Sequence, residues 1–189
     1  MIKKGIKIVS PLANEQIIKL KIGDLVKISG YLYTARDSAH KKLFELIKKG
    51  EKLPIELKGQ VIFYAGPTPS KPGYPCGSIG PTSGYRMDPY TPLLLEHGLK
   101  GMIGKGLRSK EVIESIKKNK AIYFTVIGWA AALIGKSVKQ CKEVFFPELE
   151  GEMMYKLFVN NLETIVAIDS KGNNLFELEQ KKYEKLVIS

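Results

Sequence analysis

The sequence predicts an α/β fold built on a mixed sheet. Strand-like and helix-like segments alternate between about residue 25 and residue 139, which is typical of parallel strands joined by helices. After Cys141 strand-like segments dominate, which indicates antiparallel strands in the same sheet. Apolar residues make up 44% of the 189 residues, enough for the chain to form its own core, and one domain over residues 1–189 fits that length.

The first elements follow from apolar spacing. Apolar residues alternate weakly around a turn at Ser10-Pro11, and Leu25–Leu32 has the composition of a strand. Asp37 suits the N-cap of a helix over Ser38–Lys49, where apolar residues recur at helical spacing. Val61–Tyr64 is a short apolar run, so we expect a buried strand.

A long loop follows that strand. Residues 66–85 contain five prolines and five glycines, and a loop of this length in a compact domain is usually functional. Asp88 before Pro89 predicts the start of a helix that carries Leu93–Leu95 and ends at Gly98.

The second half repeats the alternation and then changes. We expect strands at Gly101–Ile103 and Ala121–Ile127, and helices at Ser109–Lys118 and Ala130–Lys139. Three later strands are expected at Val144–Phe146, Met154–Val159 and Thr164–Ile168, and residues 169–173 are expected to form a turn between two of the later strands.

The charge and cysteine content exclude several classes of function. The net charge is +11, but the lysines are scattered as pairs without interleaved aromatic residues, which argues against a nucleic-acid-binding surface. No apolar run is long enough to span a membrane and the first residues do not suit a signal peptide, so we expect a cytoplasmic protein without a membrane partner. With only Cys76 and Cys141, the chain lacks the cysteines to hold zinc or an iron–sulfur cluster by itself.

Arginine is unusually scarce. Of the 30 basic residues, 27 are lysines and only three are arginines, Arg36, Arg86 and Arg108. A planar guanidinium binds a carboxylate through two parallel hydrogen bonds, which an ammonium cannot do. We therefore expect arginine where that geometry matters.

The loops after the strands gather groups that bind anions. Thr82, Ser83 and Arg86 lie at the boundary between the long loop and a helix, and Arg36 ends a strand. Lys105 lies between two glycines that allow close approach of a ligand. The alternatives are a surface turn with an Arg86–Asp88 ion pair, an Arg36–Asp37 ion pair, and a tight turn with a solvated lysine.

Other motifs carry less weight. His40, three residues after Asp37, is expected to make a capping or supporting contact. Cys76 has no base near it in sequence, so we expect no reactive thiol. The glycines at 101–106 do not follow the dinucleotide-binding order, and residues 130–137 lack the glycines of a P-loop, so no nucleotide cofactor is expected.

Five ordered motifs resemble the β subunit, or C-terminal domain, of class I fumarate hydratases and the related L-tartrate dehydratases. The motifs are Thr34–His40, Tyr64–Thr68, Gly77–Ser83, Arg86–Asp88 and Ile103–Gly106. The resemblance continues through Ala130–Leu133 and Ile168–Asn173 and thus covers nearly the whole chain.

The resemblance implies a three-layer β/β/α swivelling domain and an enzyme that interconverts fumarate and L-malate. It implies a 4Fe–4S cluster held by a cysteine-bearing α subunit, in an α2β2 heterotetramer, and a C4 dicarboxylate substrate. By match to the family motifs, Arg36, Arg86 and Lys105 bind the substrate carboxylates and Thr82 is the candidate catalytic base. Supporting roles around them are expected for a further set: Asp37, His40, Ser83 and Asp88.

Two alternatives stay open. The sequence does not choose between fumarate and tartrate, which are both C4 dicarboxylates, and Thr82 either removes the proton or only orients the substrate. From another class, a stand-alone anion-binding or interaction module would carry the same cationic loops without any chemistry.

Overall fold

A computed structural model describes residues 5–70, 72–126 and 131–180, with the side chains of 131–133 left out. Its helices, strands and short 3₁₀ segments (η), in chain order, are β1 Ile6–Ser10, α1 Asn14–Ile17, β2 Leu25–Thr34, α2 Asp37–Lys48, β3 Val61–Phe63, η1 Gly84–Met87, α3 Thr91–Glu96, β4 Gly101–Gly104, α4 Lys110–Asn119, β5 Ile122–Val126, α5 Ala131–Ser137, β6 Val138–Phe145, η2 Pro147–Glu152 and β7 Met154–Ile168. Residues 175–180 are also helical. None of the helices in these ranges has the length and apolarity needed to cross a membrane.

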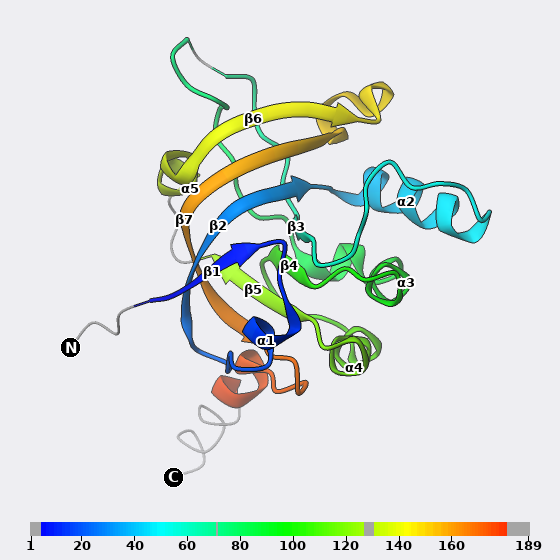
Figure 1. Ribbon diagram of the computed structural model, residues 1–189, viewed down its shortest axis with the longest axis vertical. Helices are drawn as coiled ribbons and strands as arrows, with labels where there is room; N and C mark the ends of the chain where they lie inside the picture. The colour runs from blue at the N-terminus through cyan, green and yellow to red at the C-terminus, as the bar shows by residue number, and fades with distance from the viewer. Residues whose placement is uncertain (1–4, 71, 127–130, 181–189) are drawn as a thin grey trace.

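The sheet is mixed, as predicted. Its strands lie in the order β1-β2-β3-β4-β5-β7-β6, and the pairs from β1 to β5 are parallel. Strand β7 runs antiparallel to β5 and β6, and also to β2, so that β2, β3, β4, β5 and β7 close into a ring (Figure 1).

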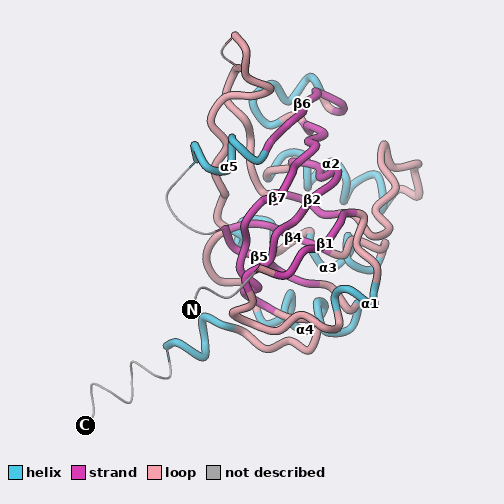
Figure 2. Tube along the Cα trace, turned by 60° about the vertical axis from the view of Figure 1, so that its left-hand side comes forward, coloured by secondary structure: helices cyan, strands magenta, loops and turns pink. Residues whose placement is uncertain are grey.

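Two hydrophobic cores lie on opposite faces of the parallel strands. Successive residues of a strand point to opposite faces. Val61 and Phe63 of β3 therefore join the core inside the ring, whereas Ile62 and the following Tyr64 join the core beneath the helices. Helices α2, α3 and α4 cover this second face (Figures 1 and 2), which explains why β3 is apolar at every position.

Two predicted helix starts are wrong. Helix α2 begins at Asp37 itself, and its N-cap is Arg36, whose side chain makes no capping bond. Helix α3 begins at Thr91, after an N-cap at Tyr90, because Asp88 directs its carboxylate to Arg108 and to the backbone N–H of Ser109. In contrast, α4 starts close to the predicted point, with the Ser109 hydroxyl accepting a bond from the N–H of Val112.

The C-terminal third differs most from expectation. The two strands predicted at 154–159 and 164–168 are one strand, β7, with a register shift against β2 where Asn161 takes a positive φ of 53°. The predicted helix 130–139 ends at Ser137, and β6 begins at Val138. The turn at 169–173 leads into the helix at 175–180 instead of another strand. The end of the predicted strand 121–127 and residue 130 lie outside the described residues.

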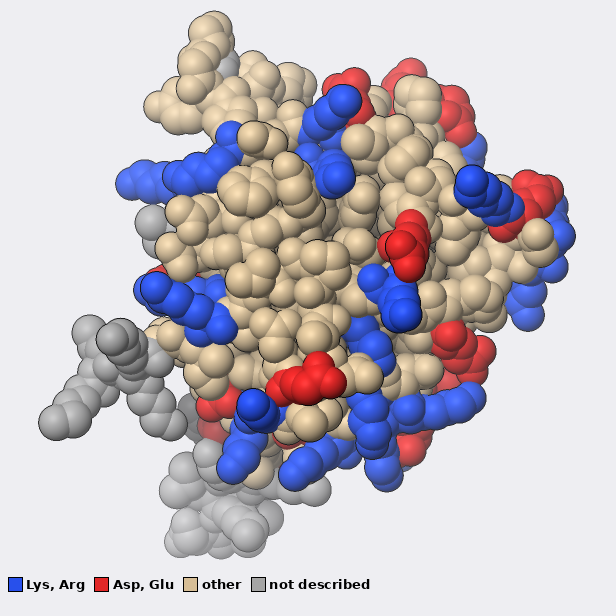
Figure 3. Space-filling model, viewed as in Figure 1, with Lys and Arg blue, Asp and Glu red and all other residues tan. Residues whose placement is uncertain are grey.

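The face seen in Figure 1 is largely uncharged at its centre. In the space-filling view of Figure 3, lysine, arginine and acidic side chains lie mostly around the rim. The uncharged area lies over β1, β2 and β7.

Candidate functional site

The predicted site residues collect at the carboxyl ends of the parallel strands β2, β3 and β4. In α/β proteins, ligands bind at the carboxyl ends of the parallel strands, because the loops after neighbouring strands meet there. Arg36 follows β2, residues 64–68 follow β3, and Lys105 follows β4. Three segments that are far apart in sequence therefore share one edge.

The far end of the long loop is bound into this edge by backbone hydrogen bonds. The N–H of Thr82 donates to the carbonyl of Tyr64 (2.6 Å), and the N–H of Lys105 donates to the carbonyl of Thr82 (3.2 Å). Ser83 forms a parallel bridge with Lys105. Thr82, Ser83 and Lys105 thus lie side by side, and their side chains make no hydrogen bond to any other described residue.

Arg86 is held by Asp37. Its Nε donates to Oδ1 of Asp37 at 2.8 Å, which joins the 3₁₀ turn η1 to the start of α2. This pairing differs from the Arg86–Asp88 ion pair that local sequence offers. The second carboxylate oxygen of Asp37 is buried and has no hydrogen-bond partner among the described residues.

Arg36 is held by an acidic residue that the sequence analysis missed. Nη2 of Arg36 lies 3.2 Å from Oε1 of Glu152, and Oε2 of Glu152 accepts a 3.1 Å hydrogen bond from the N–H of Ser38. The Ser38 hydrogen bond, together with the charges of Arg36 and Arg86, lowers the pKa of Glu152 below its usual range. Glu152 belongs to η2, 116 positions after Arg36, and no local pattern points to it.

His40 binds the backbone of the turn that contains Arg36. Its Nδ1 lies 2.9 Å from the carbonyl oxygen of Arg36, and its ring packs edge-on against Tyr64 with 5.1 Å between ring centroids. Burial lowers the pKa of His40 to about 4, so the imidazole is neutral near pH 7 and Nδ1 donates the proton. The predicted supporting contact of His40 is thus a bond to the backbone of Arg36.

Asp88 lies beside the site but acts on Arg108. Arg108 is buried, and its guanidinium donates to Oδ1 of Asp88 (2.6 Å), to the hydroxyl of Thr91 (2.8 Å) and to the hydroxyl of Tyr64 (3.3 Å). A Cβ at Gly84 would lie 2.8 Å from Cδ of Arg108, so this position needs glycine. The third arginine is therefore part of the interior.

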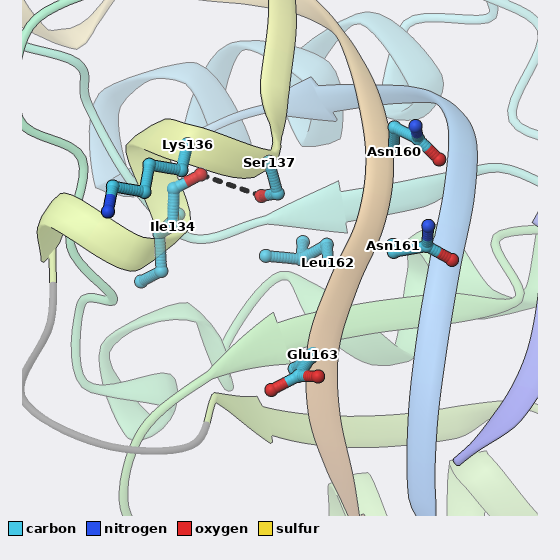
Figure 4. Close-up of a pocket in the computed structure, with 7 residues that line it drawn as sticks. All are labelled: Ile134, Lys136, Ser137, Asn160, Asn161, Leu162 and Glu163. Atoms are coloured by element: carbon cyan, nitrogen blue, oxygen red, sulfur yellow. Dashed lines mark hydrogen bonds between the residues drawn. The ribbon is translucent and has the colours of Figure 1, made fainter. Parts of the chain in front are cut away.

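Two cavities of about 320 and 350 Å³ lie away from the predicted site residues. Figure 4 shows the first, which lies between α5 and β7 and is lined by Ile134, Lys136, Ser137, Asn160, Asn161, Leu162 and Glu163. The second is lined by residues of β2, β6 and β7. None of the predicted site residues lines either cavity.

Comparison with known proteins shows the family. The chain matches the family described as Fumarase C-terminus over residues 2–179. The chain belongs to the Fumarase C-terminus family. The predicted resemblance is thereby confirmed.

Relatives in this family carry names of hydro-lyases. A Methanocaldococcus jannaschii protein named as an L(+)-tartrate dehydratase subunit beta is 39% identical over 182 residues, which cover 93% of each chain. Fumarate hydratase 2 of Leishmania major is 39% identical over 164 residues, and the anaerobic class I fumarate hydratase of Escherichia coli is 38% identical over 164 residues. Both matches cover 86% of this chain but only 29% and 30% of the fumarate hydratases.

The described residues of this chain do not offer the ligands that an iron–sulfur cluster needs. No group of three or more His, Cys, Asp or Glu side chains that could hold a metal ion occurs in the part of the chain that the structure describes. Cys76 lies in the long loop and packs in the same core as Cys141 of β6, and this neighbouring thiol lowers the pKa of Cys76 to about 7. The sequence analysis found no base near Cys76, and the neighbour that the structure places there is the thiol of Cys141.

Proposed function

We propose that this chain is the β subunit of a hydro-lyase that interconverts fumarate and L-malate, and that it supplies the carboxylate-binding side of the site. The observation that carries the proposal is that two arginines are held at neighbouring turns by acidic residues, Arg36 by Glu152 and Arg86 by Asp37, and that each keeps guanidinium donors without a partner among the described residues. Two such groups suit a substrate with two carboxylates, since each guanidinium accommodates one.

The remaining residues have roles that follow from their chemistry. Lys105 adds an exposed positive charge beside Thr82 and stabilises the charge that builds up on the substrate during reaction. When malate loses water, a proton leaves the carbon next to one carboxylate. Thr82 is the residue of this chain that removes this proton. Its side chain accepts a proton only in the deprotonated alkoxide form, which neighbouring positive charges stabilise. Ser83 places a second hydroxyl beside it.

The 4Fe–4S cluster of class I enzymes belongs, in this proposal, to a cysteine-bearing α subunit in an α2β2 assembly. The residues of this chain do not fit a cluster, and none of the steps assigned to them runs through one. We further propose that residues 1–189 form a single three-layer β/β/α swivelling domain in the cytoplasm; the two cores on either face of the parallel strands support the layer assignment.

A second substrate is supported by a specific observation. The match to the protein named as a tartrate dehydratase β subunit extends over 93% of both chains, whereas the fumarate hydratases are about three times longer than the matched region. L-tartrate is therefore the alternative substrate, and the same carboxylate-binding groups serve it.

Anaerobic assays test the proposal. The purified chain and the chain co-expressed with a cysteine-bearing α subunit are each assayed with fumarate and with L-tartrate. We expect no turnover by the chain alone and turnover of one substrate by the pair. Turnover by the chain alone, or no turnover of either substrate by an intact pair that contains iron, would contradict the proposal; dicarboxylate binding by the isolated chain without any activity in the pair would favour an anion-binding module.

A further inference from the structure

Glu152 connects two donors of a single turn. One of its carboxylate oxygens faces the Arg36 guanidinium at 3.2 Å and the other accepts the N–H of Ser38 at 3.1 Å. Arg36 and Ser38 flank the first residue of α2. The carboxylate therefore ties a flexible side chain to the backbone of the helix from which it projects.

The segment that carries Glu152 is anchored on both sides. Glu148 of η2 forms an ion pair with Lys42 of α2, and the N–H of Tyr155 donates to the hydroxyl of Thr34 at the end of β2 (3.0 Å). Within the segment, the N–H of Met153 donates to the carbonyl of Glu150 (3.0 Å). In Figure 1 this connection between β6 and β7 lies beside the start of α2. Glu152 is thus held in place and is not free to swing away.

A guanidinium is planar, so one fixed nitrogen restricts the orientation of the others. Glu152 contacts Nη2 of Arg36, and Nη1 has no partner among the described residues. Asp37 does the same for Arg86, where it holds Nε and leaves both terminal nitrogens without a described partner. In each case an acidic residue of the chain occupies one part of the guanidinium. Nη1 of Arg36 and both terminal nitrogens of Arg86 are left for a ligand, whereas Nε of Arg36 is buried without a described partner.

We propose that Glu152 is a positioning residue for the carboxylate-binding site: it holds the Arg36 guanidinium against the start of α2 in the orientation that receives a substrate carboxylate. This inference rests on the proposed function for the identity of the ligand. The bridge itself is a property of the free chain and is testable without activity.

The first test uses the scarcity of arginine. A ¹H–¹⁵N spectrum of the full chain contains only three arginine Nε–H signals, and Arg36→Lys assigns one of them. In Glu152→Gln, whose amide oxygen accepts only one of the two bonds, we expect faster rotation of the Arg36 guanidinium. Glu150→Gln is the control, because Glu150 is exposed on the same segment and its side chain makes no hydrogen bond or ion pair with a described residue; it leaves the Arg36 signal unchanged. The signal of buried Arg108 reports in every variant that the fold is intact.

The second test is kinetic and uses the assembled enzyme. We expect Glu152→Gln to raise KM for the dicarboxylate about tenfold with a smaller change in kcat, since a charge-assisted bond that orients Arg36 is lost. Glu152→Asp keeps the charge and is expected to recover part of the affinity. Glu150→Gln should have wild-type KM.

Three results would overturn the inference. A lower KM in Glu152→Gln would mean that Glu152 competes with substrate for Arg36; an unchanged KM, or an Arg36 signal that is unaffected, would mean that the bridge does not position the guanidinium. If the wild-type pair turns over neither substrate, the proposed function fails, while the Arg36 spectrum still decides whether Glu152 restrains that side chain.

Discussion

Arg108 and Arg86 both pair with an aspartate through Nε, yet their surroundings are opposite. The Arg108 side chain has no exposed surface, and all three of its nitrogens contact groups of the chain. The Arg86 side chain is 41% exposed, and its only described partner is Asp37. Arg36 resembles Arg86, because Glu152 is its single carboxylate partner.

This difference separates arginine that stabilises the fold from arginine that is available to a ligand. A buried ion pair that loses one partner leaves an uncompensated charge in the interior. An exposed pair contributes little to stability, because water and salt screen it. Substitution of Arg108 should therefore lower mainly the stability of the fold, and substitution of Arg86 should lower mainly the activity.

The largest effect is expected for Arg108→Met. The substitution leaves Asp88 without its guanidinium partner and removes the donors to Thr91 and Tyr64, so we expect the free energy of unfolding to fall by about 3–5 kcal/mol. Arg86→Met is the control and should cost less than about 1 kcal/mol. Urea unfolding of the purified chain measures both, and equal losses would remove the distinction between the two regions.

A pH-dependent effect is expected at His40, which lies between the two regions. The pKa of His40 is about 4 in the folded chain because of burial, whereas the unfolded chain binds the proton near pH 6.5. The contribution of His40 to the free energy of unfolding is therefore constant above pH 6.5. It decreases by about 3 kcal/mol as the pH falls from 6.5 to 4.

His40→Asn should remove this part of the pH dependence while retaining a donor for the carbonyl of Arg36. His97 makes the same bond to the carbonyl four residues before it but is exposed, so His97→Asn is the matched control. Unfolding measured at several pH values gives the slopes. If wild type and His40→Asn lose stability in parallel over this range, the imidazole is not held neutral.

The exposed arginines should respond in activity. We expect Arg36→Lys and Arg86→Lys to reduce kcat/KM of the assembled enzyme about 30-fold, because an ammonium cannot make two parallel bonds to a carboxylate. Their unfolding free energies should stay close to wild type. Lys118→Arg, at an exposed ion pair with Glu96, is a control for basic substitutions. Wild-type kinetics in both lysine variants would refute the assignment.

The smallest effect is expected at Lys105. This side chain is exposed and acts as a point charge, so Lys105→Ala should raise KM about fivefold, which corresponds to about 1 kcal/mol. Lys110→Ala, an exposed lysine at the start of α4, should leave KM unchanged. Equal KM values for the two variants would exclude a role for Lys105 in binding.

Local pattern predicted the elements whose signals are local. Apolar runs and helical spacing located β2, β3, α2 and α4 within a few residues. The pattern failed at β7, where Asn160-Asn161 looks like a break but forms a bulge inside a continuous strand that the partner β2 holds together.

The site residues also separate into those with a local sequence signal and those without one. Thr82, Arg86 and Lys105 were predicted as site residues because they stand in loops of unusual composition, and their roles remain predictions. Glu152 was missed, and Arg108 was singled out only as one of three scarce arginines without a role, because the contacts of Glu152 lie far along the chain and those of Arg108 depend on burial.

The closure of the ring by β7 has a consequence for biosynthesis. The hydroxyl of Thr164 donates to the carbonyl of Val26, 138 positions earlier, and strands β2 to β5 are synthesised before their antiparallel partner leaves the ribosome. Until then one edge of β2 and one edge of β5 lack their native neighbours. Glu152 also arrives late, so the turn that contains Arg36 acquires its carboxylate contact only after 116 further residues have been translated.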